Sequence, residues 1–331
     1  MKFSSPAADV YVPDRTPVAK ALARTTHLCI AAHQDDIEIM AYHGIAECFG
    51  RRDRGFTGVV VTDGSGSPRA GRFSKFSDEQ MKAARRAEQR RAAKIGKYTA
   101  AIQLAHPSAL VKSAQSTAVR ADLMAILQAA APHTVYLHNP ADKHDTHVAV
   151  FLRSLEALRA LPKAQRPKQV YGCEVWRDLD WLPDTDKQVL DASANPKLAE
   201  KLVAVFRSQI AGGKRYDLAT AGRRLANATF HTSHATDRAT ALTWAMDLTP
   251  LVQNHRLPVE KTLSRLILHS CAGGDRTNPR DFAGVKNAAT KSPLPVENHR
   301  ALNGRMQAVV HRAVERGLLQ HALWVLRLQK R

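Results

Sequence analysis

The sequence predicts an α/β protein in which helices cover both faces of a mostly parallel sheet. Its 331 residues have an ordinary globular composition, with 44% hydrophobic and 24% charged residues. Short apolar runs that end abruptly at a polar residue alternate with longer segments of helical periodicity. Strands and helices that alternate at this spacing form βαβ units, so we expect a Rossmann-like three-layer αβα sandwich.

The expected strands are short and apolar, and the expected helices carry apolar residues at intervals of three and four. The strands are 28–32, 57–61, 101–104, 134–137 and 169–173, and the helices are 36–49, 77–96, 118–131, 147–161 and 196–207. Ser77 and Gln80 have the spacing of a capping box, which predicts that a helix begins there. Beyond Trp176 the pattern is weaker, so few elements are assigned in that part of the chain.

The composition divides the chain into three segments. Residues 1–25 form a proline-containing leader, and residues 26–255 contain the alternating pattern. Residues 256–331 form a basic C-terminal extension whose fold the pattern does not define. We therefore expect one α/β domain that is flanked by two less regular segments.

The charge balance and the cysteine pattern restrict the class of protein. The 49 Lys and Arg residues exceed the 30 Asp and Glu residues by 19, which favours anionic partners or reflects a general use of Arg. No apolar run approaches the roughly 20 residues of a membrane helix, and the N-terminus lacks the apolar core of a secretory signal. The four cysteines form no CxxC pair, so we expect a cytoplasmic protein with no membrane span and no disulfide framework.

Two polar clusters follow the ends of the first and fourth expected strands. Residues 33–38 read His-Gln-Asp-Asp-Ile-Glu, and residues 142–147 read Asp-Lys-His-Asp-Thr-His. In open α/β sheets, ligands bind outside the carboxyl ends of the strands. The two clusters, which lie more than 100 positions apart, are therefore expected to face one site.

The residue types in these clusters are those of a catalytic metal site. A turn between strand and helix can bring His33 and Asp36 to one point, and His144 and His147 share a helix face. Two histidines and one carboxylate leave a coordination position for water, whose pKa a bound dication lowers to about 7. Of the adjacent Asp35 and Asp36, one can ligate while the other accepts the proton of the water. A helix cap and a solvated surface pair are the simpler interpretation, but the position of both clusters at strand ends disfavours it.

Four short motifs follow one another in this part of the chain. They are Ala32-His33-Gln34-Asp35-Asp36-Ile37-Glu38, Val61-Thr62-Asp63-Gly64, Arg85-Arg86-Ala87-Glu88 and His144-Asp145-Thr146-His147. In the same order they resemble the motifs His-Pro-Asp-Asp-x-Glu, Thr-Asp-Gly, Arg-x-x-Glu and His-Pro-Asp-His of the PIG-L/LmbE family of zinc-dependent N-acetylglucosaminyl deacetylases. The motifs cover residues 26–150 and weaker similarity continues beyond them, so the resemblance implies an LmbE-like deacetylase domain over residues 26–255.

The resemblance also implies a role for each residue of the motifs. His33, Asp36 and His147 would ligate Zn²⁺, with Fe²⁺ as the alternative ion. Asp35 would be the general base, and His144 would stabilise the oxyanion or protonate the leaving amine.

The chain departs from the family motifs at two places. Gln34 replaces the usual proline, which makes the turn after the first strand less rigid. Asp145-Thr146 replaces Pro-Asp between the two histidines, so the carboxylate that orients a histidine ligand would come from Asp145 or Asp142. Neither departure changes an inferred ligand, but both affect the expected substrate and efficiency.

Other residues are candidates for substrate contacts. Arg85 would shape the rim of the site, or would form a surface ion pair with Glu88 on the same helix. Lys214 and Arg215 follow a glycine pair and are interpreted as ligands of an anionic group. Trp176 is interpreted as a core residue.

The function expected from these observations is metal-dependent removal of an acetyl group from an N-acetylated amino sugar or sugar conjugate, which can be anionic. One alternative is an amidase that acts on another sugar-linked or thiol-conjugate amide. A non-haem iron oxygenase uses similar ligands, but the alternating strands and helices and the extra Asp35 argue against it. A basic nucleic-acid-binding protein on a non-catalytic deacetylase-like scaffold is disfavoured, because the C-terminal extension has few aromatic residues and is better explained as a homo-oligomer contact.

Overall fold

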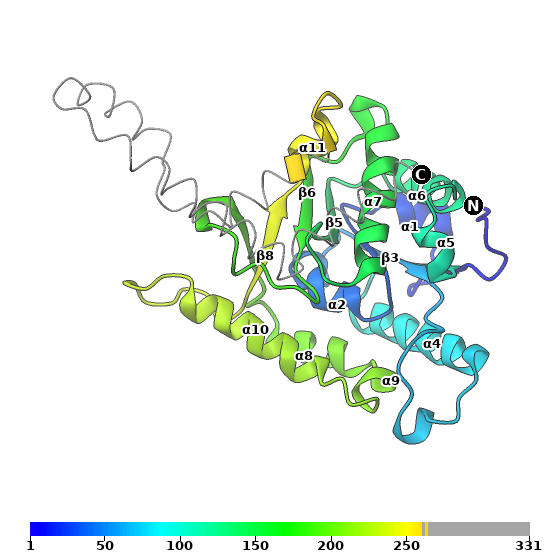
Figure 1. Cartoon of the computed structure of the whole chain (residues 1–331), viewed down its shortest axis with the longest axis horizontal. Helices are drawn as coiled ribbons and strands as arrows, with labels where there is room; N and C mark the ends of the chain where they lie inside the picture. The colour runs from blue at the N-terminus through cyan, green and yellow to red at the C-terminus, as the bar shows by residue number, and fades with distance from the viewer. Residues whose placement is uncertain (260–261, 264–331) are drawn as a thin grey trace, which may run out of the picture.

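A computed structural model describes residues 1–259 and 262–263 of the chain (Figure 1). In this part the strands form one sheet of eight strands in the order β1-β4-β3-β2-β5-β6-β8-β7. The strands are β1 (Asp9–Tyr11), β2 (His27–Ala31), β3 (Phe56–Thr62), β4 (Ala100–His106), β5 (Thr134–His138), β6 (Gln169–Cys173), β7 (Lys187–Asp191) and β8 (Leu242–Asp247). β4, β3, β2, β5 and β6 are parallel, whereas β1, β8 and β7 pair antiparallel. The expected mostly parallel α/β sheet is therefore confirmed.

Helices cover both faces of the sheet. They are α1 (Val18–Ala23), α2 (Asp36–Met40), α3 (Tyr42–Cys48), α4 (Asp78–Ile95), α5 (Ser108–Lys112), α6 (Ala118–Ala130), α7 (Asp145–Ala160), α8 (Pro196–Ala204), α9 (Arg207–Ile210), α10 (Tyr216–Phe230) and α11 (Thr249–Gln253). Short 3₁₀ turns lie at Gly71–Phe73, Lys163–Gln165 and Asp184–Asp186. None of the helices in the described part of the chain combines the length and the apolar character that crossing a bilayer requires.

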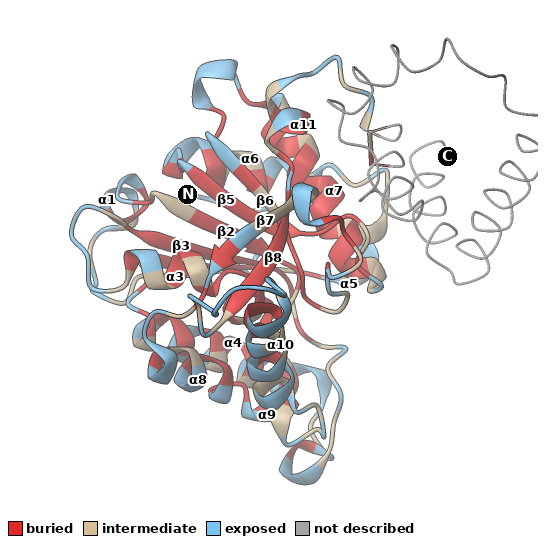
Figure 2. Ribbon diagram, turned by 90° about the vertical axis from the view of Figure 1, so that its left-hand side faces the viewer, coloured by how far each residue is buried: buried red, intermediate tan, exposed pale blue. Residues whose placement is uncertain are grey.

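The central strands alternate their side chains between two apolar cores. In β2, Leu28 and Ile30 face the core formed with α6 and α7, while Cys29 and Ala31 face the core formed with α3, α4 and α8. All four side chains are fully buried, because a parallel sheet with helices on both faces hides both sides of its strands. Figure 2 shows this burial as a nearly continuous buried interior beneath the exposed outer faces of α8 and α10. The long apolar runs of the sequence follow from this arrangement.

Most of the expected elements are present, with instructive differences. The capping box forms at the start of α4, where Ser77 Oγ accepts the Gln80 N–H at 3.2 Å and Gln80 Oε1 accepts the Ser77 N–H at 2.9 Å. The helix expected over 36–49 is divided into α2 and α3 at Ala41, whose φ of −114° is not helical. β1 lies within the expected leader and pairs with β4. The expected extension, 256–331, lies outside the described residues apart from 256–259 and 262–263.

The strand order creates a crevice at one point of the sheet. From β2 the chain adds β3 and β4 on one side, and later adds β5 and β6 on the other side. The carboxyl ends of β2 and β5 are therefore neighbours at the point where the order reverses, which is where open α/β sheets bind ligands. Both polar clusters of the sequence begin at these two strand ends.

Candidate metal centre

The turn after β2 presents two carboxylates in different directions. Asp35, at the N-cap of α2, has a φ of 95°, a backbone conformation that non-glycine residues rarely adopt and that costs about 1–3 kcal/mol. Asp36 follows in helical conformation, and its Oδ2 accepts the His33 N–H at 2.7 Å. The sharp turn therefore directs Asp36 back toward His33 and leaves Asp35 free to face another partner.

The segment after β5 is organised by Asp142. Its Oδ1 accepts the backbone N–H of His144 at 3.0 Å, its Oδ2 accepts the backbone N–H of Trp176 at 3.1 Å, and Oδ2 lies 3.4 Å from His147 Nδ1. A carboxylate in this position fixes the ring of a histidine ligand and raises its basicity. Asp145 is directed elsewhere, with an oxygen 3.9 Å from Lys112 Nζ. Of the two carboxylates that the sequence left open, Asp142 is the one beside His147.

Three donor atoms from the two clusters meet at coordination distances. His33 Nδ1 lies 3.1 Å from His147 Nε2, and Asp36 Oδ2 lies 3.3 Å from each of these nitrogens. In a tetrahedral zinc site with bonds of about 2.1 Å, neighbouring ligand atoms lie about 3.4 Å apart. The separations and the two-histidine, one-carboxylate donor set therefore fit an ion of the size of Zn²⁺.

Two further histidines surround these donors and have different roles. His138, Asp36 and His147 are close enough to share an ion, and so are His33, His144 and His147. However, His138 Nε2 accepts the Ala32 N–H at 2.9 Å, so this nitrogen has no free lone pair for an ion. The His138 ring instead stacks on His147, with ring centroids 4.0 Å apart.

His144 occupies the opposite side of His147, with their ring centroids 4.6 Å apart. Its Nδ1 accepts the Thr146 N–H at 3.3 Å as the N-cap of α7. This hydrogen bond assigns the proton of the neutral ring to Nε2. His144 can therefore act as a hydrogen-bond donor within the site.

Burial controls the protonation of the cluster. It raises the pKa of Asp35 to about 6, although the neighbouring Arg85 acts in the opposite direction. It also raises the pKa of Asp36 to about 7 and lowers that of His33 to about 4. His147 is likewise held neutral, because burial keeps its pKa well below the usual range. Neutral histidines are the form that binds a metal, and a dication beside Asp36 would favour its carboxylate.

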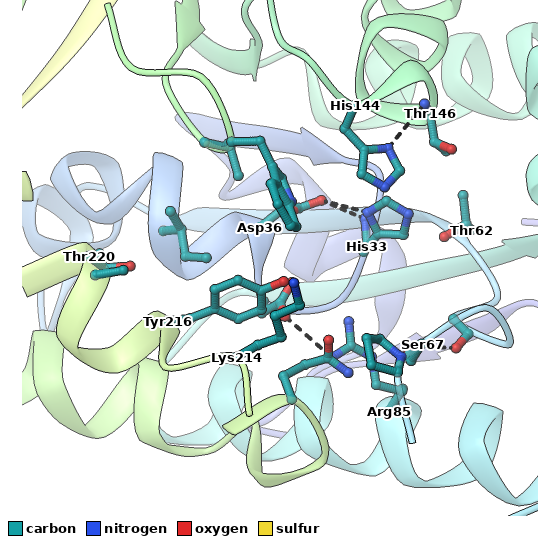
Figure 3. Close-up of a pocket in the computed structure, with 18 of the residues that line it drawn as sticks. His33, Asp36, Thr62, Ser67, Arg85, His144, Thr146, Lys214, Tyr216 and Thr220 are labelled. Carbon is teal, nitrogen blue, oxygen red and sulfur yellow. Dashed lines mark hydrogen bonds and ion pairs between the residues drawn. The ribbon is translucent and has the colours of Figure 1, made fainter. Parts of the chain in front are cut away.

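A cavity of about 530 Å³ opens beside these residues (Figure 3). Its walls come from the loop after β3, from α4, from α10 and from the segments that carry Trp176 and Lys214. Lys214 and Tyr216 extend into the cavity opposite His33 and His144. The cavity is large enough for a sugar-sized ligand, which a pocket of about 300–1,000 Å³ accommodates.

Of the three predicted substrate contacts, Arg85 and Lys214 line the cavity and Arg215 does not. Arg85 is buried on α4 and lines the cavity, with Nη1 3.3 Å from Asp35 Oδ2 and Nη2 donating to the Gln34 carbonyl. Its partner is therefore Asp35, while Glu88 accepts hydrogen bonds from the backbone and side chain of Ser208.

Lys214 and Arg215 are adjacent in sequence but differ in environment. Lys214 lines the cavity, and so does Trp176, which also packs against the core formed with α3, α4 and α8, as a partly buried residue. Arg215 does not line the cavity, because its exposed guanidinium pairs with Asp217 at 2.8 Å. The sequence analysis also missed Tyr216 and the stacking role of His138. The position of His138 at the end of an apolar strand is the signal that could have identified it.

Comparisons with known proteins find a family model that matches part of the chain and solved structures with a similar fold. Residues 28–158 match the PIG-L family model, which is described as GlcNAc-PI de-N-acetylase. No curated protein matches the sequence. Among solved structures, the N,N′-diacetylchitobiose deacetylase from Pyrococcus horikoshii is 16% identical with a TM-score of 0.55, and the match covers 76% of this chain and 93% of that one.

Two other similar structures show how widely the fold is used. The 4-carboxy-2-hydroxymuconate hydratase from Pseudomonas putida is 17% identical with a TM-score of 0.51, over 68% of this chain and 96% of that one. A conserved protein from Thermus thermophilus is 18% identical with a TM-score of 0.51, over 71% of this chain and 96% of that one. A hydratase and a deacetylase thus share the architecture, so the fold alone does not determine the reaction.

The family match extends from β2 into the last turns of α7, so it includes both polar clusters and the loop, helix and strand between them. The similarity to the PIG-L family model therefore covers the part of the chain that holds the candidate metal centre.

Proposed function

We propose that the protein is a metal-dependent N-deacetylase that removes the acetyl group of an N-acetylated amino sugar or sugar conjugate. The observation that carries this proposal is the meeting of three donor atoms, from His33, Asp36 and His147, within 3.1–3.3 Å of one another at the edge of a sugar-sized cavity. The family match supports the same reaction. An amidase that cleaves another sugar-linked or thiol-conjugate amide would use the same residues and differ only in the cavity wall.

Zn²⁺ is the ion that we assign to this site, and Fe²⁺ is the alternative. Bound there, it would supply a Lewis acid and a water of lowered pKa. Two neutral imidazoles and one carboxylate are common ligands of both ions, and the compact spacing favours four-coordinate zinc.

Asp35 is the general base of the proposed reaction. Its carboxylate lies at the wall of the cavity in which a substrate would bind, and Arg85 holds it there. Because burial raises the pKa of Asp35 to about 6, this carboxylate can both accept and release a proton near neutral pH. Removal of a proton from the attacking water is therefore within its range.

His144 acts on the other side of the amide. Its Nε2–H donates to the oxygen on which negative charge develops, and the same proton can pass to the nitrogen of the departing amine. Two groups with opposite functions thus face one cavity, as hydrolysis of an amide requires.

The test compares metal content with acetate release. Wild type, Asp36→Ala and Asp35→Asn are purified, the metal per chain is measured by mass spectrometry, and each protein is incubated with a panel of N-acetylglucosamine derivatives. Wild type should hold about one ion and release acetate, Asp36→Ala should lose both, and Asp35→Asn should retain the ion while turnover falls by about 10²–10⁴. Near-wild-type turnover by the metal-loaded Asp35→Asn variant would contradict the mechanism.

A further inference from the structure

Two ammonium groups that lie over the ring of Trp176, a residue of the cavity wall, have no counter-ion in the described part of the chain. Lys143 lies between β5 and α7, and Lys214 lies between α9 and α10. Their Nζ atoms are 5.7 Å and 5.2 Å from the centre of the Trp176 ring, at cation–π distance. Among the residues that the structure describes, no carboxylate lies within ion-pair distance of either lysine. Two cations from separate segments are therefore gathered on one indole.

The acidic residues of the cavity wall are already engaged. Asp35 pairs with Arg85, and Asp36 contacts the candidate metal ligands. Glu174 is buried and accepts hydrogen bonds from the backbone N–H groups of Leu179 and Trp244 and from the Asn227 side chain. None of these carboxylates can neutralise the lysines without losing its own partners.

The indole that carries the lysines has a fixed position relative to the reacting groups. The backbone N–H of Trp176 donates to Asp142 Oδ2, the same oxygen that lies beside His147 Nδ1. The Trp176 ring also lies 6.0 Å from the His144 ring and 6.2 Å from the Tyr216 ring. A cation–π contact restrains an ammonium group while leaving N–H donors for a ligand. The lysines are thus held at a set distance from the candidate metal centre.

We infer that Lys143, Lys214 and Trp176 form an anion subsite, and that the substrate carries a phosphate or carboxylate group beside its N-acyl amino sugar. The identity of the sugar depends on the proposed deacetylase function, whereas the subsite depends only on the two lysines and the indole. Arg215 was expected to bind the anionic group together with Lys214, but its guanidinium pairs with Asp217. Lys143 has that role in the proposed subsite. A neutral sugar would leave both ammonium groups without a partner.

The test measures how strongly the site prefers anionic ligands. The zinc-loaded full-length Asp35→Asn protein is titrated calorimetrically with N-acetylglucosamine 1-phosphate, its 6-phosphate, N-acetylmuramic acid and neutral methyl N-acetylglucosaminide. At least one anionic ligand should bind about tenfold more tightly than the neutral one, which two partly screened ion pairs supply. The preference should decrease as NaCl is raised from about 20 mM to about 500 mM. The phosphate and carboxylate ligands distinguish the two sources of negative charge.

Substitutions identify the groups responsible. Lys143→Gln and Lys214→Gln, combined with Asp35→Asn, should each reduce the ratio of anionic to neutral affinity severalfold, and the double substitution should bring it to about one. Lys97→Gln is the matched control, because the Lys97 ammonium lies 4.9 Å from the centre of the Phe49 ring, and Phe49, unlike Trp176, does not line the cavity. A preference that persists in the double variant, or equal binding of anionic and neutral ligands, would overturn the subsite.

A second probe makes the result independent of the sugar. Pyrophosphate is titrated into the metal-free full-length protein and into the metal-free double lysine variant, and the affinity should fall about tenfold or more in the variant. Equal affinities would contradict the subsite even if no sugar binds. Lysine-dependent anion binding without acetate release from any ligand would instead leave the subsite intact and refute the deacetylase. Acetate release that is equally fast for neutral and anionic sugars would instead support the deacetylase and contradict the subsite.

Discussion

At the scale of single residues, Asp142 connects the candidate metal centre to the cavity wall. One carboxylate holds the backbone of His144, the backbone of Trp176 and the ring of His147. Asp145, three positions further along the chain, has the same side chain but is partly exposed and faces Lys112. The difference lies in the path of the loop between β5 and α7, which the residue types alone do not specify.

Removal of the Asp142 charge should weaken metal binding. Asp142→Asn should lower the zinc affinity about 10–100-fold, because His147 loses the carboxylate that fixes its ring and raises its basicity. Competition with a chelator measures the affinity, and Asp145→Asn is the control that should bind zinc as the wild type does. Equal zinc affinities of the two variants would contradict the assignment of Asp142.

Substitutions of one glycine after α3 and two in the loop after β3 separate backbone strain from steric overlap. Gly64 has a φ of 77°, and a Cβ there would lie 2.7 Å from Gln34 Oε1, so Gly64→Ala should cost about 2 kcal/mol of unfolding free energy. Gly50→Ala, with a φ of 73° and open space, should cost about 1 kcal/mol. Gly66→Ala has neither problem and should change stability little. Urea unfolding of the three variants gives the order, and an equal cost at Gly64 and Gly66 would refute this explanation.

At the scale of elements, the parallel strands were predictable and the antiparallel ones were not. β2, β3 and β5 are mainly apolar because both faces of each are buried. β7 reads Lys-Gln-Val-Leu-Asp and has only Leu190 buried, so its composition does not distinguish it from a loop. α10 carries Leu218 and Leu225 exposed and Arg224 buried, which reverses the usual pattern of a surface helix.

The same reasoning explains which parts of the site were predictable. His33, Asp36, His144 and His147 each follow a strand end closely, so the topology alone brings them together. The pairing of Lys143 with Lys214 depends instead on two loops that approach Trp176 from different parts of the chain. No spacing along the sequence encodes that approach.

The first residue of β2 should make the fold sensitive to acid. Burial lowers the pKa of His27 to about 4, and the nearby His43 and Arg54 lower it further. The unfolded chain, with a histidine pKa of about 6.5, binds the proton more strongly, so stability is complete above pH 6.5 and is lost as the pH falls toward 4. Between pH 4 and pH 6.5, the unfolding free energy should therefore fall less steeply with decreasing pH in His27→Gln than in the wild type. The difference in slope should be at most about 1.4 kcal/mol per pH unit. Identical slopes for the metal-free wild type and variant would show that His27 does not contribute.

At the scale of the whole molecule, the candidate ligands join two halves of the sheet. His33 and Asp36 follow β2, and His147 belongs to the helix after β5, so an ion held between them bridges the point where the strand order reverses. Because such an ion binds only the folded chain, its binding free energy adds to the stability of the fold.

Zinc should therefore raise the unfolding temperature of the full-length protein. Free zinc at about 100 times its dissociation constant adds about 2.7 kcal/mol to the unfolding free energy. Thermal unfolding of the wild type with zinc and with a chelator measures the effect, and Asp36→Ala should show none. A similar zinc-dependent rise in Asp36→Ala would place the ion elsewhere on the molecule.

One side of the cavity is built on the buried sheet, and the other side is built on exposed connecting segments. The candidate metal ligands extend from the buried centre of the sheet, where β2 is paired on both sides. Lys214 and the glycines of the loop after β3 lie on connecting segments with few ladder hydrogen bonds. Amide hydrogen exchange should therefore be slowest in β2 and fastest in these segments. As the denaturant concentration rises, the protein should therefore lose its preference for anionic over neutral ligands before it releases the ion. The two losses should have different midpoints.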